Sequence, residues 1–148
     1  MFKSGFGSPT CNYWLGNELL HQVTTSGQYK LRFDVQALAS GQWYWAEYSS
    51  VIVQSEATKY RLTVGAYSGN AGDSVTPVNK RKFTTFDSDN DVKDGMNCAV
   101  ERGGGFWWRK CGACHVTASA ANDKSFRWKQ LGEGDTRLQT SRGWIMCV

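Results

Sequence analysis

The sequence predicts an α+β fold in which a small twisted antiparallel sheet with short helices carries a loop-rich region. Several short segments of the first half alternate between polar and apolar residues, as half-buried strands do. After Tyr67 this alternation stops, and Gly, Ser, Asn and Asp dominate as far as Gly105. A long irregular segment needs an ordering agent besides a hydrophobic core. A metal ion or a disulfide is the usual one.

The expected elements follow one another in a simple order. A short helix over residues 17–23 begins at Asn17, a favourable N-terminal cap. Residues 28–35 alternate between polar and apolar side chains, which predicts a half-buried strand. Residues 43–53 are typical of one long or broken strand, and residues 60–64 repeat the alternation. The first half is therefore expected to form the sheet.

The chain has the length of one domain, because 148 residues are enough for a single core. Hydrophobic residues make up 41% and charged residues 20%, a composition that favours a folded globule. From Phe126 onward, a final segment that ends with Trp144 to Val148 is expected to return as a strand. The expected division is sheet and helix over about 1–67, calcium-binding and ligand-binding loops over about 68–128, and the returning strand over about 129–148.

Composition and motifs exclude some classes of protein. No apolar run approaches the roughly 18 residues of a membrane span. Residues 2–10 lack the apolar segment of a signal peptide, so a secreted form is expected to be a mature fragment or to carry an added Met1. The sequence contains no nucleophile elbow, HExxH or phosphate loop, so an enzyme is not expected. The basic cluster at residues 80–82 is typical of a solvated loop, so nucleic acid is not the expected partner.

One short segment has the composition of a calcium loop. Asp87, Asp89 and Asp91 stand at alternate positions, and calcium takes six to eight oxygens from carboxylates and carbonyls. An EF-hand is excluded, because Val92 stands where that loop needs Gly and Cys98 where it needs Glu. Composition alone leaves two alternatives, a calcium site or a solvated acidic turn.

Four motifs stand in a fixed order along the chain: Trp14 to Asn17 (WLGN), Tyr67 to Ser74 (YSGNAGDS), Phe83 to Asp91 (FTTFDSDND) and Asn97 to Ala99 (NCA). Together they resemble fibrinogen-related domains, which occur in fibrinogen chains, ficolins, tachylectins and angiopoietins. The resemblance implies a fibrinogen C-terminal-like fold that lacks the family's N-terminal portion, and an extracellular, secreted recognition module.

The resemblance also implies a calcium (Ca2+) site. By position, Asp89 and Asp91 are expected to be side-chain ligands, and the backbone carbonyls near Lys93 and Gly95 complete the shell. Asp87 is expected to support the site from outside.

Five cysteines give an odd number, so at least one stays free or bonds elsewhere. The resemblance implies that Cys98 forms a disulfide beside the ligand pocket. Counting without gaps selects Cys111 as its partner, whereas matching by motif selects Cys114, and we favour Cys111. A zinc set of these three cysteines with His115 is disfavoured, because a His directly after Cys lacks the usual finger spacing.

The ligand pocket is also expected from the resemblance. Lectin-like members of the family hold an N-acetyl group with a His and nearby aromatics, which points to His115. The residues expected at the pocket are His115, Lys110, Arg102, Trp108, Asn122 and Asp123. Trp107 and Trp108 have a second interpretation as core residues, because buried indoles carry much of a small domain's apolar area.

Two functions are compatible with these features. The first is an innate-immune lectin for acetylated or anionic microbial glycans, such as N-acetylated sugars, lipopolysaccharide or peptidoglycan. The second is a protein-binding module in which the same pocket takes a peptide or a receptor loop. The net charge of +4 favours anionic partners and hence the first. Homo-oligomers are expected if weak sites act together.

Overall fold

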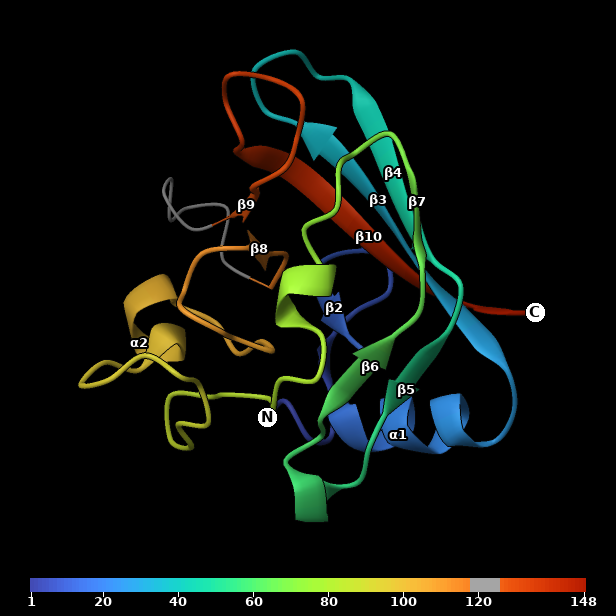
Figure 1. Cartoon of the computed structure of the whole chain (residues 1–148), viewed down its shortest axis with the longest axis vertical. Helices are drawn as coiled ribbons and strands as arrows, with labels where there is room; N and C mark the ends of the chain where they lie inside the picture. The colour runs from blue at the N-terminus through green and yellow to red at the C-terminus, as the bar shows by residue number, and fades with distance from the viewer. Residues whose placement is uncertain (118–125) are drawn as a thin grey trace.

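The alternating segments of the first half form antiparallel strands, which are divided between a main sheet and a separate two-stranded sheet (Figure 1). The computed structural model describes residues 1–117 and 126–148. The main sheet has the strand order β10-β3-β4-β7, and each neighbouring pair is antiparallel. Its strands are β3 (Tyr29–Ala37), β4 (Trp43–Tyr48), β7 (Tyr67–Gly69) and β10 (Leu138–Cys147). Strand β10 falls in the segment expected to return as a strand, and it lies at one edge of this sheet.

The two faces of the main sheet differ as the alternation predicts. On one face, Phe33 and Val35 of β3 are buried in the core. On the other, the indole Nε1 of Trp144 donates to Asp34 Oδ2 at 2.8 Å, and the Arg32 guanidinium lies 4.9 Å from the Trp45 ring centroid. Apolar burial on one face fixes the register, since a shift by one residue would place Phe33 in solvent.

Helix α1 (Asn17–Thr25) packs against the hairpin of β5 (Val51–Val53) and β6 (Leu62–Val64) (Figure 1). The expected cap at Asn17 is wrong, because Asn17 is the first helical residue, it is only 2% exposed, and Gly16 precedes the helix. Gly16 has φ +102°, and a Cβ there would approach the Gly5 backbone nitrogen to 2.8 Å. Only glycine fits this entry to the helix.

The segment over residues 43–53 is broken rather than continuous. β4 belongs to the main sheet, and β5 pairs with β6 in a second, two-stranded sheet. The change occurs at Ser49 and Ser50: the backbone N–H of Ser49 donates to Ala66 O, and Ser50 O accepts from the Gly65 N–H. These two bonds hold the chain where it leaves one sheet for the other.

The loop-rich half contains only short elements. These elements are η2 (Thr76–Val78), α2 (Cys98–Arg102), β8 (Cys114–His115) and β9 (Arg127–Trp128). The first half adds three short elements, β1 (Phe6–Gly7), β2 (Tyr13–Trp14) and the 3-10 helix η1 (Glu56–Thr58). Among the described residues, no helix is long and apolar enough to cross a membrane.

Buried indoles attach the loops to the sheet. Trp128 is fully buried, its ring lies 5.5 Å from that of Phe33, and its Nε1 donates to Gly72 O at 2.8 Å. Trp107 is 5% exposed and donates from Nε1 to Tyr60 O at 2.7 Å. Each ring buries a large apolar area and satisfies its only donor. The interpretation of Trp107 as a core residue therefore fits its position.

Candidate ligand-binding cavity and calcium loop

The acidic loop is anchored to the body of the domain by Asn90. Its side-chain Nδ2 donates to Phe83 O at 2.9 Å, and its backbone N–H donates to Thr84 Oγ1 at 3.0 Å. Phe83 and Thr84 are buried, so this anchor is firm. The two aspartates on either side of Asn90 are left on the outer part of the loop.

Asp89 and Asp91 shape the loop through hydrogen bonds to backbone N–H groups. Asp89 Oδ1 accepts from the Asp91 N–H at 3.1 Å, and Asp91 Oδ1 accepts from the Lys93 N–H at 2.7 Å. Asp91 Oδ2 accepts from the Cys98 N–H at 2.8 Å, which joins the loop to α2. An ionised carboxylate has about four acceptor positions, so both side chains keep acceptor capacity for a cation.

Asp87 lies apart from this arrangement. Its Oδ1 accepts from the Thr85 hydroxyl at 2.6 Å, and this hydrogen bond lowers the pKa of the Asp87 carboxyl. Gly95 has φ +71°, a conformation that glycine adopts easily, and it turns the chain toward α2. The structure therefore places Asp87 in a neighbouring turn, and Lys93 and Gly95 along the segment between Asp91 and α2.

The donor set suits a hard cation. Within residues 1–117 and 126–148, no three His, Cys, Asp or Glu side chains form a cluster that could hold a metal. A cation at this loop would therefore be held by two carboxylates, Asp89 and Asp91, together with backbone carbonyls such as those of Lys93 and Gly95. Oxygen ligands of this mixed kind are typical of calcium.

A disulfide joins α2 to the segment that follows the tryptophans. Cys98 and Cys111 are bonded, 13 positions apart in the chain, and both are buried. A closed loop of this size stabilises the fold by roughly 3 kcal/mol in the chain-entropy model. The bond also excludes the zinc arrangement, which needs both thiolates as metal ligands.

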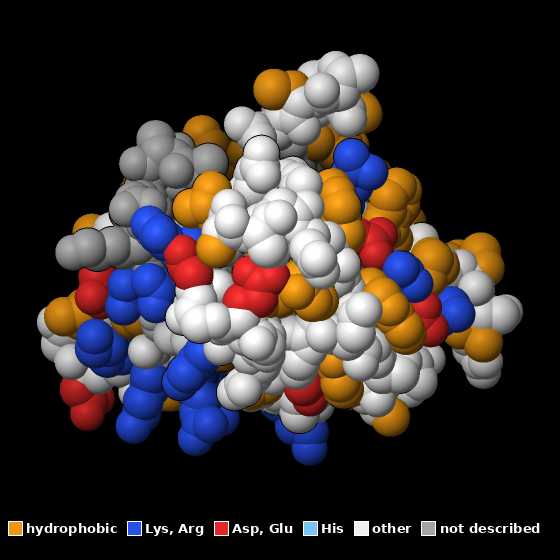
Figure 2. Space-filling view, turned by 90° about the horizontal axis from the view of Figure 1, so that it is seen from above, with side chains coloured by type: hydrophobic (Ala, Val, Ile, Leu, Met, Phe, Trp, Pro, Cys, Tyr) orange, Lys and Arg blue, Asp and Glu red, His pale blue; other side chains and the backbone are white. Residues whose placement is uncertain are grey.

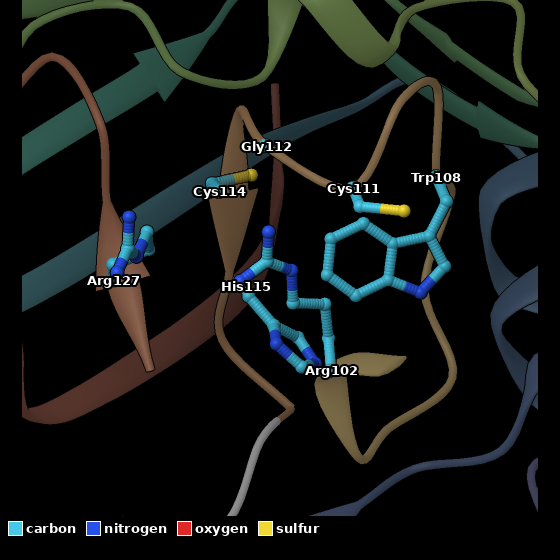
Figure 3. Close-up of a pocket in the computed structure, with 7 residues that line it drawn as sticks. All are labelled: Arg102, Trp108, Cys111, Gly112, Cys114, His115 and Arg127. Carbon is cyan, nitrogen blue, oxygen red and sulfur yellow. The ribbon is translucent and has the colours of Figure 1, made fainter. Parts of the chain in front are cut away.

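A small cavity lies beside this disulfide, and its volume is about 10 Å³. Figure 3 shows the Arg102 side chain extending beside His115 and Trp108, with Arg127 on the opposite side. The lining residues are Arg102, Trp108, Cys111, Gly112, Cys114, His115 and Arg127. Such a volume holds about one water molecule.

His115 is held in place by close packing. It is 2% exposed, and its ring centroid lies 4.4 Å from that of Trp108. A Cβ at Gly104 would lie 2.9 Å from His115 Nε2, so only glycine at that position leaves room for the ring. Trp108 is 1% exposed and donates from Nε1 to Gly104 O at 3.1 Å. His115 and Trp108 therefore form the buried floor of the cavity.

Two arginines give the cavity its chemical character. The buried Nε atoms of Arg102 and Arg127 have no hydrogen-bond partner among the described residues. Arg102 approaches Glu101 at 3.7 Å through Nη2, and the described residues that line the cavity include no Asp or Glu. Buried donors usually have acceptors, so the cavity favours a ligand that carries oxygen acceptors or negative charge.

Cys114 is a buried free thiol under the cavity. Burial, with a smaller contribution from the Asp73 carboxylate, raises the pKa of this thiol well above its usual range. The thiol therefore stays protonated at neutral pH and is a poor nucleophile.

The structure brings together some of the expected pocket residues and separates others. Arg102, Trp108 and His115 line the cavity with Cys111, whereas Lys110 lines a second hollow beside it. Asn122 and Asp123 lie outside the described residues. Sequence reasoning missed Arg127, Gly112 and Cys114 as lining residues. Arg127 of β9 pairs with His115 of β8, and this pairing would have revealed Arg127 as a lining residue. Both strands are too short to recognise from sequence.

The sequence matches the family of "Fibrinogen beta and gamma chains, C-terminal globular domain" over residues 1–135. Chicken (Gallus gallus) tenascin is 44% identical over 110 residues, which are 74% of this chain and 6% of tenascin. Ryncolin-4 of Cerberus rynchops is 43% identical over 111 residues, 74% of this chain and 32% of ryncolin-4. The matched region thus spans less than a third of these relatives.

Solved structures show the same fold. The fibrinogen-like globe domain of human ANGPTL2 superposes with a TM-score of 0.88 at 34% identity, over 98% of this chain and 70% of that domain. A lamprey fibrin D-dimer in complex with the peptide Gly-His-Arg-Pro-amide superposes with a TM-score of 0.83 at 25% identity. The match covers 98% of this chain and 54% of the fibrin chain. The fold and the disulfide-bridged loops define a fibrinogen-like globe. The chain belongs to the family of fibrinogen C-terminal globular domains.

Proposed function

We propose that the domain is a secreted recognition module that binds acetylated or anionic microbial glycans at the cavity between Arg102 and His115. The observation that carries this proposal is the pair of buried Nε donors of Arg102 and Arg127, which have no hydrogen-bond partner within residues 1–117 and 126–148. Both arginines line the cavity, and its described lining has no acidic residue. The carbonyl oxygen of an N-acetyl group or a carboxylate would satisfy them. The buried Trp108 ring supplies an apolar floor beside them.

The ligand enters only if the cavity opens. Its volume of about 10 Å³ is too small for an acetyl group, and the long side chains of Arg102 and Arg127 form part of its lining. The Arg102 side chain is 28% exposed, so rotation toward solvent is open to it. The buried floor of Trp108 and His115 stays fixed. We therefore expect binding to rearrange the arginines and leave the rings in place.

Calcium belongs to the proposal as the agent that orders the neighbouring loop. Asp89 and Asp91 would hold the ion with the carbonyls near Lys93 and Gly95. The ion supplies charge neutralisation and fixes the loop. Because Asp91 also accepts from the Cys98 N–H, order in the loop is transmitted to α2, which carries Arg102.

The chemistry of the cavity agrees with a role in binding rather than in catalysis. The raised pKa of the Cys114 thiol removes the obvious nucleophile next to His115. The proposal also includes a secreted location and assembly into homo-oligomers, which would strengthen weak binding.

A second candidate function is recognition of a peptide. It is favoured by the lamprey fibrin D-dimer, a structure of the same fold that is complexed with a four-residue peptide amide. The ligand would then be a protein segment whose carbonyl or carboxylate oxygens reach the two arginines.

Binding to immobilised N-acetylglucosamine, lipopolysaccharide and peptidoglycan, with calcium or with a chelator, tests the proposal. We expect binding in calcium and a loss of at least about tenfold in affinity with chelator or in the Asp89→Asn variant. Asp94→Asn is the matched control, since Asp94 is an exposed neighbour with the same charge. Arg102→Gln should weaken binding with calcium present.

The outcomes separate the two candidates. Binding of none of the three glycans, together with binding of a peptide amide in a competition assay, would replace the lectin with the peptide-binding module. Equal calcium-induced thermal stabilisation of the wild type and Asp89→Asn would show that Asp89 is not a ligand. Equal losses in Asp89→Asn and Asp94→Asn would mean that charge alone matters.

A further inference from the structure

A second hollow of about 220 Å³ lies on the other side of the segment that carries Cys111 and Gly112. Three separate segments line it: Ser74 and Pro77, then residues 109–113, then Lys129 and Gln130. Its lining consists of Ser74, Pro77, Arg109, Lys110, Gly112, Ala113, Lys129 and Gln130, and we call it the basic groove. Gly112 lines both the groove and the cavity, so the two are separated by one stretch of backbone.

The walls of the basic groove are fixed to one another. The backbone N–H of Lys129 donates to Ala113 O at 3.1 Å, and that of Gln130 donates to Ser74 Oγ at 3.0 Å. The disulfide at Cys111 also fixes the wall formed by residues 109–113. The groove is therefore pre-formed, so a ligand would not have to pay the entropic cost of ordering its walls.

The groove is strongly cationic. Arg109, Lys110 and Lys129 are exposed, and none of them forms an ion pair with an acidic residue that the structure describes. No Asp or Glu is among the described residues that line the groove. Figure 2 shows Lys and Arg side chains gathering over the loop-rich half, with some acidic groups at their border. Three uncompensated cations around one hollow create a positive potential that attracts anions.

The nearest acidic group along the lining segments is Asp73, next to Ser74. Its Oδ1 accepts from the Tyr48 hydroxyl at 3.0 Å and from the Thr76 N–H at 3.0 Å. These bonds use the carboxylate to hold the loop, and Asp73 does not line the groove. It reduces the positive potential without blocking the site.

We propose that the basic groove binds a sulfate or phosphate ester group of an anionic polysaccharide. Guanidinium and ammonium groups donate several strong hydrogen bonds to such tetrahedral oxyanions. The volume of about 220 Å³ lies below that of pockets for drug-sized ligands and suits one charged sugar unit. The lining has no aromatic ring, so it offers nucleobases no stacking surface. The groove acts independently of acetyl recognition in the cavity and of calcium.

The test compares two triple variants of equal charge. Arg109→Gln, Lys110→Gln and Lys129→Gln together remove the cations of the groove. Lys59→Gln, Lys80→Gln and Lys82→Gln together remove three exposed cations elsewhere. Affinity for dextran sulfate is measured for each by titration, and unsulfated dextran is the negative probe. All six side chains are exposed, so circular dichroism should confirm that both variants fold.

We expect the wild type to bind dextran sulfate but not dextran, and the groove variant to lose about tenfold or more in affinity. The control should lose clearly less, and added salt should weaken binding in every protein. Phosphomannan tested beside dextran sulfate distinguishes a phosphate from a sulfate ester. Equal losses in both variants would overturn the proposal, as would equal affinity for polyglutamate. Neither result would bear on N-acetylglucosamine binding at the cavity.

Discussion

Cys114 and His115 are adjacent in the chain and almost fully shielded from solvent, 1% and 2% exposed. Their surroundings differ: His115 packs against an indole, whereas the thiol of Cys114 lies near the carboxylate of Asp73. Burial penalises the charged thiolate, and the nearby negative charge adds to that penalty. Ionisation of this single group is therefore coupled to folding.

This coupling predicts a loss of stability at alkaline pH. The folded pKa of Cys114 is raised, so stability is complete below the unfolded pKa of about 8.5 and declines as pH rises above it. Between pH 7.5 and 9.5, the wild type should lose about 1 kcal/mol more free energy of unfolding than Cys114→Ala. Urea denaturation measures both, with Cys147→Ala as the exposed-thiol control. Parallel decline of the wild type and Cys114→Ala would contradict the prediction.

The sequence predicts a site residue only where the contacts of that residue are with neighbours in the chain. The spacing of the aspartates draws attention to the acidic loop, and Asp89 and Asp91 do interact with residues that are close in sequence. Arg127 reaches the cavity through a pairing of two-residue strands, which leaves no periodic pattern. The helix cap was misassigned because the tight packing of Gly16 against Gly5 is not visible in sequence.

Helix α2 is the element that connects the acidic loop to the cavity. It has five residues, and Asn97 caps it by accepting from the N–H groups of Ala99 at 2.8 Å and Val100 at 3.2 Å. The same side chain donates from Nδ2 to Thr85 O at 3.0 Å. A helix this short cannot form on propensity alone, so its cap and the disulfide must hold it.

Two substitutions at Asn97 should separate these roles. Asn97→Ala removes both the cap and the bond to Thr85 and should cost about 2 kcal/mol of stability. Asn97→Asp keeps the acceptor that caps α2 and loses only the donor, so it should cost less. Urea denaturation at neutral pH gives both values. If Asn97→Asp is as unstable as Asn97→Ala, the cap is not what holds the helix.

Strands differ in how well alternation predicts them. β3 has nine residues with one buried face, so its pattern is clear. β7 has three residues, two of them exposed, and was not predicted. β10 begins at Leu138, inside the expected returning segment of about 129–148, and its polar residues Thr140 to Arg142 are ordered by pairing with β3. Where the local pattern does not show whether a segment is a strand, pairing with a distant segment decides it.

At the scale of the whole molecule, the core is closed by a strand from the far end of the chain. β10 pairs with β3 along its whole length, from Leu138 opposite Ala37 to Cys147 opposite Tyr29. Leu138 is buried, and Ile145 packs against the core. Without β10, the outer edge of β3 would be left unpaired.

Removal of residues 138–148 should therefore prevent formation of the native core. We expect the shortened chain to lack the near-ultraviolet circular dichroism of its packed tryptophans. Addition of a synthetic peptide of residues 138–148 should restore the signal, because an open strand edge accepts a complementary strand. A scrambled peptide is the control. A native-like spectrum of the shortened chain alone would show that β10 is dispensable.

The late position of β10 also matters while the protein is being made. Asp34 and Trp144 meet in the finished fold although they lie 110 positions apart. At typical rates of translation, a ribosome needs roughly 5 to 20 s to add that length of chain. During this interval the edge of β3 is bare and able to pair with a neighbouring nascent chain. Until β10 takes its place, this edge is the part of the sheet most open to pairing between chains.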